Sequence, residues 1–376
     1  MLPQPSLWLT LVAFLCLLGP LVFFHELGHY SVARLFGIPA ETFSIGFGKE
    51  LFGWTDRQGT RWKVAWLPLG GYVKFVGDMT PASDPADLED IPEHLRERTF
   101  QVRPVWQRFL VVLAGPAANF LLAILIFASF FAAFGIPSTS NRVVQVQTGS
   151  AAAAAGIKPG DRILQIGGRS TQSFEDIADV VILGAGERTV AVVQRGSEVL
   201  QLPVTIQSAG LRDRWGQTHK VGRLGVLGGE RAYARVPPLR LIPAATVYTL
   251  NITRGMIDGL AQVVAGRIEP KEVGGPIKVA QMAGQQAELG ILPFIELLAL
   301  FSINLGFINL LPVPMMDGGH LFFYAVEAVR RRPISAQALE MAFRGGLALI
   351  FALMLFVTVN DLGSLGLWGR LQRLIG

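Results

Sequence analysis

Cysteine and charged residues are scarce in this chain of 376 residues. Cys16 is the single cysteine, so no disulfide can form within the chain, and cysteine usage gives no indication of the redox compartment. Only 16% of the residues are charged, against about 25% in ordinary soluble domains, whereas 51% are hydrophobic. This composition excludes an ordinary soluble domain and indicates a membrane protein.

A concentrated basic surface is also lacking. The formal net charge is +5, yet the lysines and arginines are scattered along the chain. They form neither a basic tail nor a basic groove interleaved with aromatic residues, which are the usual signs of a nucleic-acid site. We therefore expect no nucleic-acid partner.

Long apolar runs are what the chain has in excess. Four segments come close to the ~20 residues that cross the hydrocarbon core of a bilayer, namely 7–24, 109–136, 291–316 and 347–368. Polar residues such as Glu296 and Asp361 interrupt the last two, but all four are interpreted as spans. No Lys or Arg precedes the first run and no small-residue cleavage site follows it, so we expect it to be retained.

Basic residues between the spans predict the topology. They gather between the first two spans and between the last two: Lys49, Arg57, Arg61, Lys63, Lys74, Arg96, Arg98, Arg103, Arg108, Arg330, Arg331, Arg332 and Arg344. By the positive-inside rule both of these loops are cytoplasmic. Both termini, and everything between the second and third spans, then lie on the outer side of the lipid bilayer.

The first span leads into a metal-binding pattern, His25-Glu26-Leu27-Gly28-His29. On a helix, His25 and His29 project from the same face and can share one metal ion, and this HExxH spacing is typical of a zinc site with Glu26 as general base. Neutral imidazoles leave the charge of Zn²⁺ intact, so bound water acidifies toward a pKa of about 7 and a carboxylate can take its proton. Ionisable residues at membrane depth are rare and usually mark function. A third protein ligand must come from elsewhere.

Asp317 is the candidate for that third ligand. Segment 241–266 is apolar enough to suggest a fifth span, but it carries two charged residues, and a crossing there would put the next span's end on the membrane face opposite to the histidines. We interpret the segment as an amphipathic helix on the outer surface, so that Asp317 emerges level with the histidines on the cytoplasmic side. His320 is a competing ligand, ranked lower because it follows a glycine pair suited to a loop.

A broken helix ends the third span, in Asn309-Leu310-Leu311-Pro312-Val313-Pro314. Unwound backbone is tolerated at membrane depth only where it lines a cavity or is buried in protein. We expect Asn309 and Pro312 to line the substrate cleft, with the Asn309 amide donating to a substrate carbonyl or its oxyanion.

Apolar and polar residues alternate within 40–77. This pattern predicts short strands at 42–48 and 61–66, followed by the glycine-rich segment 67–73. The aromatic content favours a β-hairpin that dips into the membrane interface, although a small surface hairpin is the alternative. A free strand edge there could hold a substrate in extended form. Ile45, Gly46 and Phe47 are the candidate substrate-binding residues of this edge.

Two further polar side chains need an interpretation. Asn119, in the segment Gly115-Pro116-Ala117-Ala118-Asn119 of the second span, needs a polar partner in lipid. Its role stays open between fastening two helices and supporting the metal site. His94 lies in a proline-rich acidic loop and is expected to be exposed and unrelated to the metal.

A soluble composition returns at residues 142–206. Alternating segments predict strands at 143–146, 162–166, 189–193 and 200–206, with a helix at 173–183. The order Gly156-Ile157-Lys158-Pro159-Gly160-Asp161 resembles a bacterial PDZ domain, a module that takes peptides or chain termini by adding a strand to its sheet. Another small β-rich domain is the alternative.

Together, HELGH, the GFG-containing strand, GPAAN, the PDZ-like domain and NLLPVPMMDGG resemble the site-2 protease family of intramembrane zinc metalloproteases. The match is close to the bacterial regulator-of-sigma-E protease branch and covers nearly the whole chain. It implies zinc bound by His25, His29 and Asp317, water activated by Glu26, and a cleft beside Asn309 and Pro312. It further implies a bacterial inner-membrane location and single-span membrane proteins as substrates, such as shortened anti-sigma factors or signal-peptide remnants.

The sequence thus predicts a polytopic α-helical membrane protein with about four transmembrane helices, a membrane-associated β-hairpin and an inserted extracytoplasmic PDZ-like domain. Its parts are an N-terminal membrane half (1–136), the PDZ-like domain (140–208), an extracytoplasmic amphipathic segment (209–288) and a C-terminal membrane half (289–376). A single PDZ-like domain departs from the tandem pair of the best-known branch.

Two other functions stay open. A membrane metalloprotease of soluble or prenylated peptides would share the HExxH pattern but usually draws a Glu as its third ligand. A non-catalytic PDZ scaffold would need no general base at the position of Glu26.

Overall fold

The chain divides into two compact units. One combines Met1–Ala128 with Ile242–Gly376, and the other is Ser129–Leu241. The computed structural model describes residues 5–77, 96–171, 173–212, 218–228, 231–264 and 275–364. His94 and the end of the predicted fourth span, at residue 368, lie outside these described residues.

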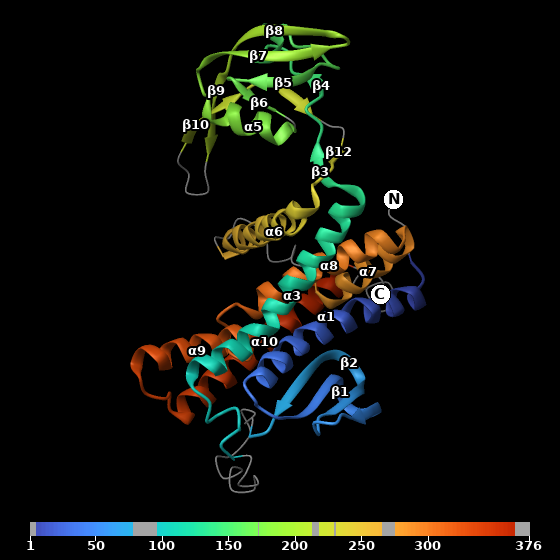
Figure 1. Ribbon diagram of the computed structural model, residues 1–376, viewed down its shortest axis with the longest axis vertical. Coiled ribbons are helices and arrows are strands. Elements are labelled where there is room, and N and C mark those ends of the chain that lie inside the picture. The colour runs from blue at the N-terminus through green and yellow to red at the C-terminus, as the bar shows by residue number, and fades with distance from the viewer. Residues whose placement is uncertain are drawn as a thin grey trace, which may run out of the picture. The chain divides into compact units, whose positions relative to one another are not determined.

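Helices form most of the membrane part of the chain (Figure 1). They are α1 (Leu7–Leu35), α3 (Val105–Phe134), α6 (Leu241–Val264), α7 (Pro276–Leu289), α8 (Ile291–Asn309), α9 (Asp317–Arg330) and α10 (Ala336–Ser364). Among the described residues, four helices are long and apolar enough to cross a membrane: α1, α3, α8 and α10. The prediction of four spans is confirmed, and α6 is not one of them, as expected.

The helix ends differ from the predicted ones. α1 continues past residue 24 to Leu35, so the HExxH residues lie within an unbroken helix. α8 ends at Asn309 instead of reaching residue 316, because a helix does not continue into the residue before a proline. α10 begins at Ala336, well before residue 347, since its polar first turns are supported by an i,i+4 ion pair between Glu340 and Arg344.

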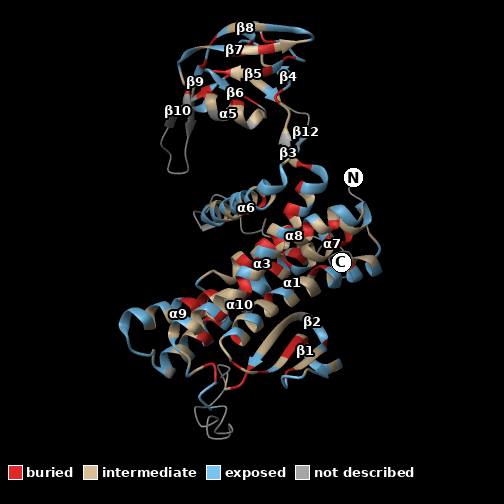
Figure 2. Cartoon of the chain, viewed as in Figure 1, coloured by how far each residue is buried: buried red, intermediate tan, exposed pale blue. Residues whose placement is uncertain are grey.

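Apolar side chains join α1 to its neighbours. One core cluster consists of Ala13, Leu17 and Leu21 of α1, Ala283 of α7, and Phe294 and Leu297 of α8. Figure 2 shows the buried positions gathered where these helices meet, with exposed residues along their outer sides. Gly28 brings α1 against α3, since a Cβ atom at Gly28 would overlap the carbonyl oxygen of Ala114. Small residues at this crossing set the distance between the two helices.

Two long bent strands, rather than the short strands predicted at 42–48 and 61–66, form the β-hairpin: β1 (Ala40–Thr55) and β2 (Arg61–Phe75). Phe43 pairs with both Trp62 and Val73, so the first half of β1 lies between the two halves of β2. Register shifts, including one at Gly46 with φ 91°, permit the bends. Among the described residues, the second half of β2 is therefore a free edge of this sheet, whereas residues 42–45 are paired on both sides.

The unit Ser129–Leu241 is rich in short strands. It contains β3 (Ile136–Thr139), β4 (Val143–Val146), α4 (Ala151–Ala154), β5 (Arg162–Ile166), β6 (Arg169–Ser170), α5 (Phe174–Leu183), β7 (Arg188–Arg195), β8 (Glu198–Thr205), β9 (Gln207–Arg212), β10 (Thr218–Arg223), β11 (Val226–Gly228) and β12 (Arg231–Ala234). The main sheet has the order β6-β5-β7-β8. Its core includes Ile163 and Val193 of the sheet and Ile177 of α5.

This β-rich unit extends further along the chain than the predicted 140–208. Strands β9 to β12 occupy the start of segment 209–288, which the sequence interpretation assigned wholly to amphipathic structure. β12 returns to pair with β3, and β11 pairs with β4. β11 and β12 are short and pair with partners far away in sequence, so a local pattern does not reveal them, whereas β9 and β10 pair with each other.

A buried carboxylate stabilises the β-rich unit. Asp161 is 1% exposed and accepts hydrogen bonds from Arg195 Nε at 2.8 Å and from the Lys158 N–H at 2.8 Å. Burial alone would raise the pKa of this carboxyl, but the Arg195 and Lys158 hydrogen bonds outweigh it and hold the pKa below its usual range.

Gly28→Ala should destabilise the protein by about 1–3 kcal/mol, because the added methyl group overlaps the α3 backbone. The measurement is thermal unfolding of the purified protein in detergent. Gly19→Ala is the matched control in the same helix, since a Cβ atom there meets nothing within 4 Å. Equal unfolding temperatures for the two variants would contradict the close α1–α3 contact.

Stability of the β-rich unit should depend on pH through Asp161. Because its folded pKa lies below the unfolded value, the stabilisation is complete above the usual Asp pKa of about 4 and is lost as pH falls through the folded pKa. Hydrogen exchange of β5 and β7 amides should be faster in Asp161→Asn than in the wild type at pH 7. The difference should shrink in acid, and a difference independent of pH would contradict this account.

Candidate metal centre

The unbroken helix α1 carries His25, Glu26 and His29. The two histidines are four residues apart and so project from one face. His25 is 8% exposed, and a buried imidazole needs partners for both ring nitrogens. One face of α1 thus presents two buried imidazoles to the centre of the membrane part.

The third residue, Asp317, begins α9 after the turn at residues 310–316. Met315 in this turn has a φ of 80°, a left-handed conformation that is rare for a residue with a side chain. A Cβ atom at Gly318 would overlap the carbonyl oxygen of Leu311, so that glycine is needed for close approach of the turn rather than for its own φ. The helix N-terminus favours the negative charge of Asp317.

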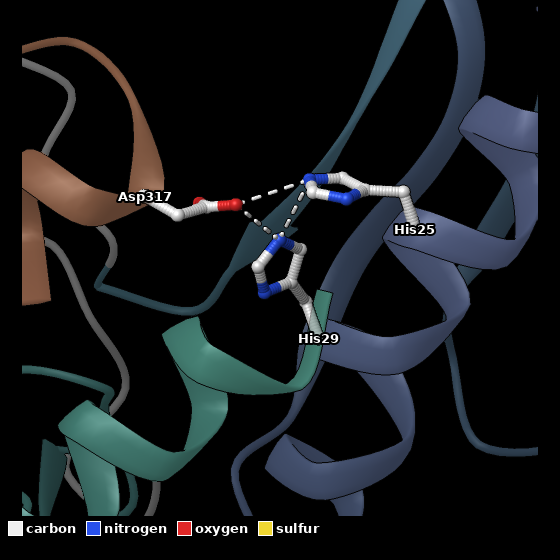
Figure 3. A group of neighbouring side chains, drawn as sticks. All are labelled: His25, His29 and Asp317. Atoms are coloured by element: carbon white, nitrogen blue, oxygen red, sulfur yellow. Dashed lines mark hydrogen bonds and ion pairs between the residues drawn. The ribbon is translucent and has the colours of Figure 1, made fainter. Parts of the chain in front are cut away.

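Three side-chain atoms converge from α1 and α9 (Figure 3). Asp317 Oδ2 lies 3.1 Å from His25 Nε2 and 3.5 Å from His29 Nε2, and the two Nε2 atoms are 3.3 Å apart. His29 Nδ1 lies 2.9 Å from the carbonyl oxygen of Val111, which can only accept, so Nδ1 carries the proton and Nε2 presents a lone pair. Electron pairs directed at one another at these distances repel unless a proton or a metal cation lies among them.

These atoms fit a zinc ion. Two imidazole nitrogens and a carboxylate oxygen are typical catalytic zinc ligands, which leave a fourth position for water or substrate. Atoms bound about 2.0–2.1 Å from one tetrahedral zinc ion are about 3.3–3.4 Å apart. The separations of 3.1, 3.3 and 3.5 Å agree with that requirement.

A cavity of about 860 Å³ opens beside the three ligand atoms. Glu26 lines it, and the backbone N–H of Val73 donates a hydrogen bond to the Glu26 carboxylate. Asn309 also lines it, with Nδ2 3.4 Å from His25 Nε2. A base, a metal-binding cluster and an amide donor therefore share one cavity, which is an arrangement suited to hydrolysis.

Other predicted site residues lie away from the cavity. Pro312 is exposed and does not line it, because the turn after α8 directs it outward. Ile45 belongs to the doubly paired part of β1 and Gly46 lies at the register shift after it, so of that predicted edge only Phe47 lines the cavity. His320 does line the cavity but is not one of the three clustered ligands. Burial lowers the pKa of His320, although the nearby carboxylate of Asp317 opposes this effect.

The sequence interpretation missed the free edge of β2, where Gly70, Gly71, Tyr72 and Val73 line the cavity. A Cβ atom at Gly71 would lie 2.6 Å from Val22 Cγ1, so this glycine lets the strand approach α1 next to Glu26. The adjacent glycines were the available signal, but their pattern alone indicates a turn as readily as a close approach.

Comparisons with known proteins agree with this site. The family model described as Peptidase family M50 matches residues 13–353. The Caulobacter vibrioides protein named metalloprotease MmpA is 40% identical over 381 residues, covering 94% of this chain and 95% of its own. The Agrobacterium fabrum protein Atu1380, named as a candidate zinc metalloprotease, is 42% identical over 361 residues, covering 94% of this chain and 96% of its own.

A solved structure is similar to part of the chain. The PDZ domain of the SdrC-like protein Lin2157 from Listeria innocua is 19% identical, with a TM-score of 0.20, and covers 25% of this chain and 99% of its own. The family match extends over most of both membrane halves, and it confirms the prediction of a zinc metalloprotease. By this match and by its relatives, the chain belongs to peptidase family M50.

Proposed function

We propose that this protein is an intramembrane endopeptidase of the regulator-of-sigma-E branch, which cleaves single-span membrane proteins within or near the bilayer. The observation that carries the proposal is the position of the His25, His29 and Asp317 cluster on and beside helices apolar enough to span a membrane. Anti-sigma factors already shortened by another protease, or signal-peptide remnants, have the required single span.

His25, His29 and Asp317 would hold the zinc ion, which supplies Lewis acidity to water and to the scissile carbonyl. Glu26 lines the same cavity and takes the proton from the attacking water, then returns it to the leaving amine. The Asn309 amide, whose Nδ2 lies 3.4 Å from His25 Nε2, would donate to the oxygen of the scissile carbonyl as negative charge develops there.

The substrate would bind along the second half of β2. Within the part of the chain that the structure describes, this edge has no pairing strand on its outer side, and it lines the cavity next to Glu26. An extended substrate can add to such an edge through backbone hydrogen bonds, and an extended peptide bond is more accessible than one within a helix. The predicted substrate contacts at Ile45 and Gly46 are thus replaced by Gly70–Val73, while Phe47 is retained.

The same proposal includes an orientation of the protein in the membrane. Loops rich in Lys and Arg follow α1 and α9, so the active site faces the cytoplasm and both termini lie outside the bacterial inner membrane. The PDZ-like unit would then be extracytoplasmic. Its cavity of about 240 Å³, lined by α5 and by residues 222–227, is the candidate site for a peptide or a chain terminus.

Two alternatives are weaker. A protease of soluble or prenylated peptides usually uses a Glu as third ligand, whereas the third member of this cluster is Asp317. A non-catalytic PDZ scaffold leaves the placement of Glu26 beside the cluster unexplained.

Glu26→Gln should lower cleavage by about 10²–10⁴-fold while zinc content and unfolding temperature stay at wild-type values, because only the proton acceptor is lost. The measurement is accumulation of intact membrane clients in cells that produce the variant, with zinc content determined on the purified protein. Glu41→Gln removes an exposed carboxylate outside the cavity and should cleave normally. Full activity of Glu26→Gln would overturn the enzymatic mechanism.

Asp317→Ala should lower zinc affinity by at least about tenfold, since one of three protein ligands is lost. The measurement is the amount of zinc bound per chain at a fixed concentration of free zinc, which gives the zinc affinity. His320→Ala tests the competing ligand and should keep zinc affinity within about threefold of the wild type. If His320→Ala lowered zinc affinity and Asp317→Ala did not, His320 rather than Asp317 would be the third ligand.

Proline placed at successive positions of an identified client should block cleavage at alternate positions near the scissile bond. Neighbouring residues of a strand direct their N–H groups to opposite sides, so only every second amide pairs with β2. Alanine at the same positions is the control. Equal loss at every position, or loss with helical spacing, would contradict edge-strand binding.

A further inference from the structure

One stripe of α3 faces both histidines without offering a metal ligand. Val111, Gly115 and Asn119 follow one another at intervals of four residues, which places them on one helix face. The carbonyl oxygen of Val111 accepts from His29 Nδ1 at 2.9 Å. A Cβ atom at Gly115 would overlap the His29 ring, so that glycine leaves the room which the ring occupies.

Asn119 meets the other histidine. It is 0% exposed, and its Nδ2 lies 3.2 Å from His25 Nδ1. Its Oδ1 is buried and has no hydrogen-bond partner within the described part of the chain. With this assignment the NH₂ group donates to Nδ1, so the proton of the neutral His25 ring would sit on Nε2, the atom that faces Asp317 and His29.

Exchanging the amide oxygen and nitrogen pairs Asn119 Oδ1 with His25 Nδ1 and moves the ring proton away from Nε2. The two atoms are indistinguishable in shape, and their assignment rests on the hydrogen-bond network. After exchange, Oδ1 accepts from His25 Nδ1–H, so the unpartnered oxygen gains a donor. The Nε2 lone pair is then free to join those of His29 and Asp317.

A role in joining two helices does not explain why position 119 carries an amide side chain. The hydrogen bond that joins α3 to α8 here runs from Ser302 Oγ to the backbone carbonyl of Asn119, at 2.7 Å. Any residue at position 119 supplies that carbonyl. The Asn119 side chain itself is hydrogen-bonded to His25.

We propose that Asn119 is a positioning residue whose amide oxygen holds His25 as the Nδ1–H tautomer, with Nε2 directed at the metal position. Val111 does the same for His29, so α3 orients both imidazoles. This inference rests on the proposed ligand set, and it adds a residue that contacts neither the metal nor the substrate.

Zinc affinity tests the inference apart from catalysis. Variants are made in full-length Glu26→Gln protein, which cannot cleave, and zinc is titrated against a chelator. Asn119→Leu keeps the size but loses the acceptor, and its affinity should fall about 10–100-fold. Asn119→Asp keeps an acceptor and should stay within about threefold of the parent. Ser302→Ala removes the α3–α8 hydrogen bond and should leave zinc affinity unchanged.

The outcomes separate this inference from the proposed function. Parental affinity in Asn119→Leu, or an equal loss in Asn119→Leu and Asn119→Asp, would overturn the positioning role. Parental affinity in His25→Ala would instead overturn the ligand set itself. Loss in His25→Ala with none in Asn119→Leu would leave the ligand set standing and reject only the inference.

A second measurement needs no variant at Asn119. Nitrogen-15 chemical shifts of the histidine rings in zinc-free protein distinguish the two neutral tautomers, and His25→Gln identifies the His25 signals. The Nδ1–H form of His25 is expected. The Nε2–H form would overturn the proposal even if Asn119→Leu failed to fold.

Discussion

Mutual repulsion among three electron-pair donors is the constraint on which the membrane part depends. His25 Nε2, His29 Nε2 and Asp317 Oδ2 lie 3.1–3.5 Å apart, within helices that otherwise bury apolar side chains. Such an arrangement is costly until a cation binds, so the fold must hold the donors in place beforehand. α1 fixes two of them through helical spacing, and the turn before α9 fixes the third.

Glycines allow these helices and strands to come close enough, because glycine has no side chain. Gly28 brings α1 against α3, Gly115 leaves room for the His29 ring, and Gly71 lets β2 reach α1 beside Glu26. In all three cases a Cβ atom would meet backbone or a side chain of the site. Glycine lowers the stability of a helix or strand by about 0.5–1 kcal/mol relative to alanine. At these contacts the close approach is therefore obtained at the expense of local helix or strand propensity.

The parts of the site that depend on local spacing were accessible from the sequence, and those that depend on distant pairing were not. The i,i+4 histidines follow from helical geometry, and Asp317 follows from the number of spans that separate it from them. The edge of β2 depends on Phe43 pairing with both Trp62 and Val73, and a local pattern of alternation carries no information about that double register. The β12–β3 pairing is hidden for the same reason. Likewise, the sequence left two roles open for Asn119, because only coordinates show that Ser302 bonds to its backbone and His25 to its side chain.

The Val73 N–H links the proposed base, Glu26, to the proposed substrate-binding edge of β2. It donates to the Glu26 carboxylate from the same strand segment that would pair with an extended substrate. Displacement of β2 would therefore shift the base and the binding edge together. A substrate paired with β2 is aligned to the strand that orients the base, and α3 independently orients the imidazoles. Base alignment and metal-ligand alignment are thus carried by different elements, which allows a change in one to leave the other intact.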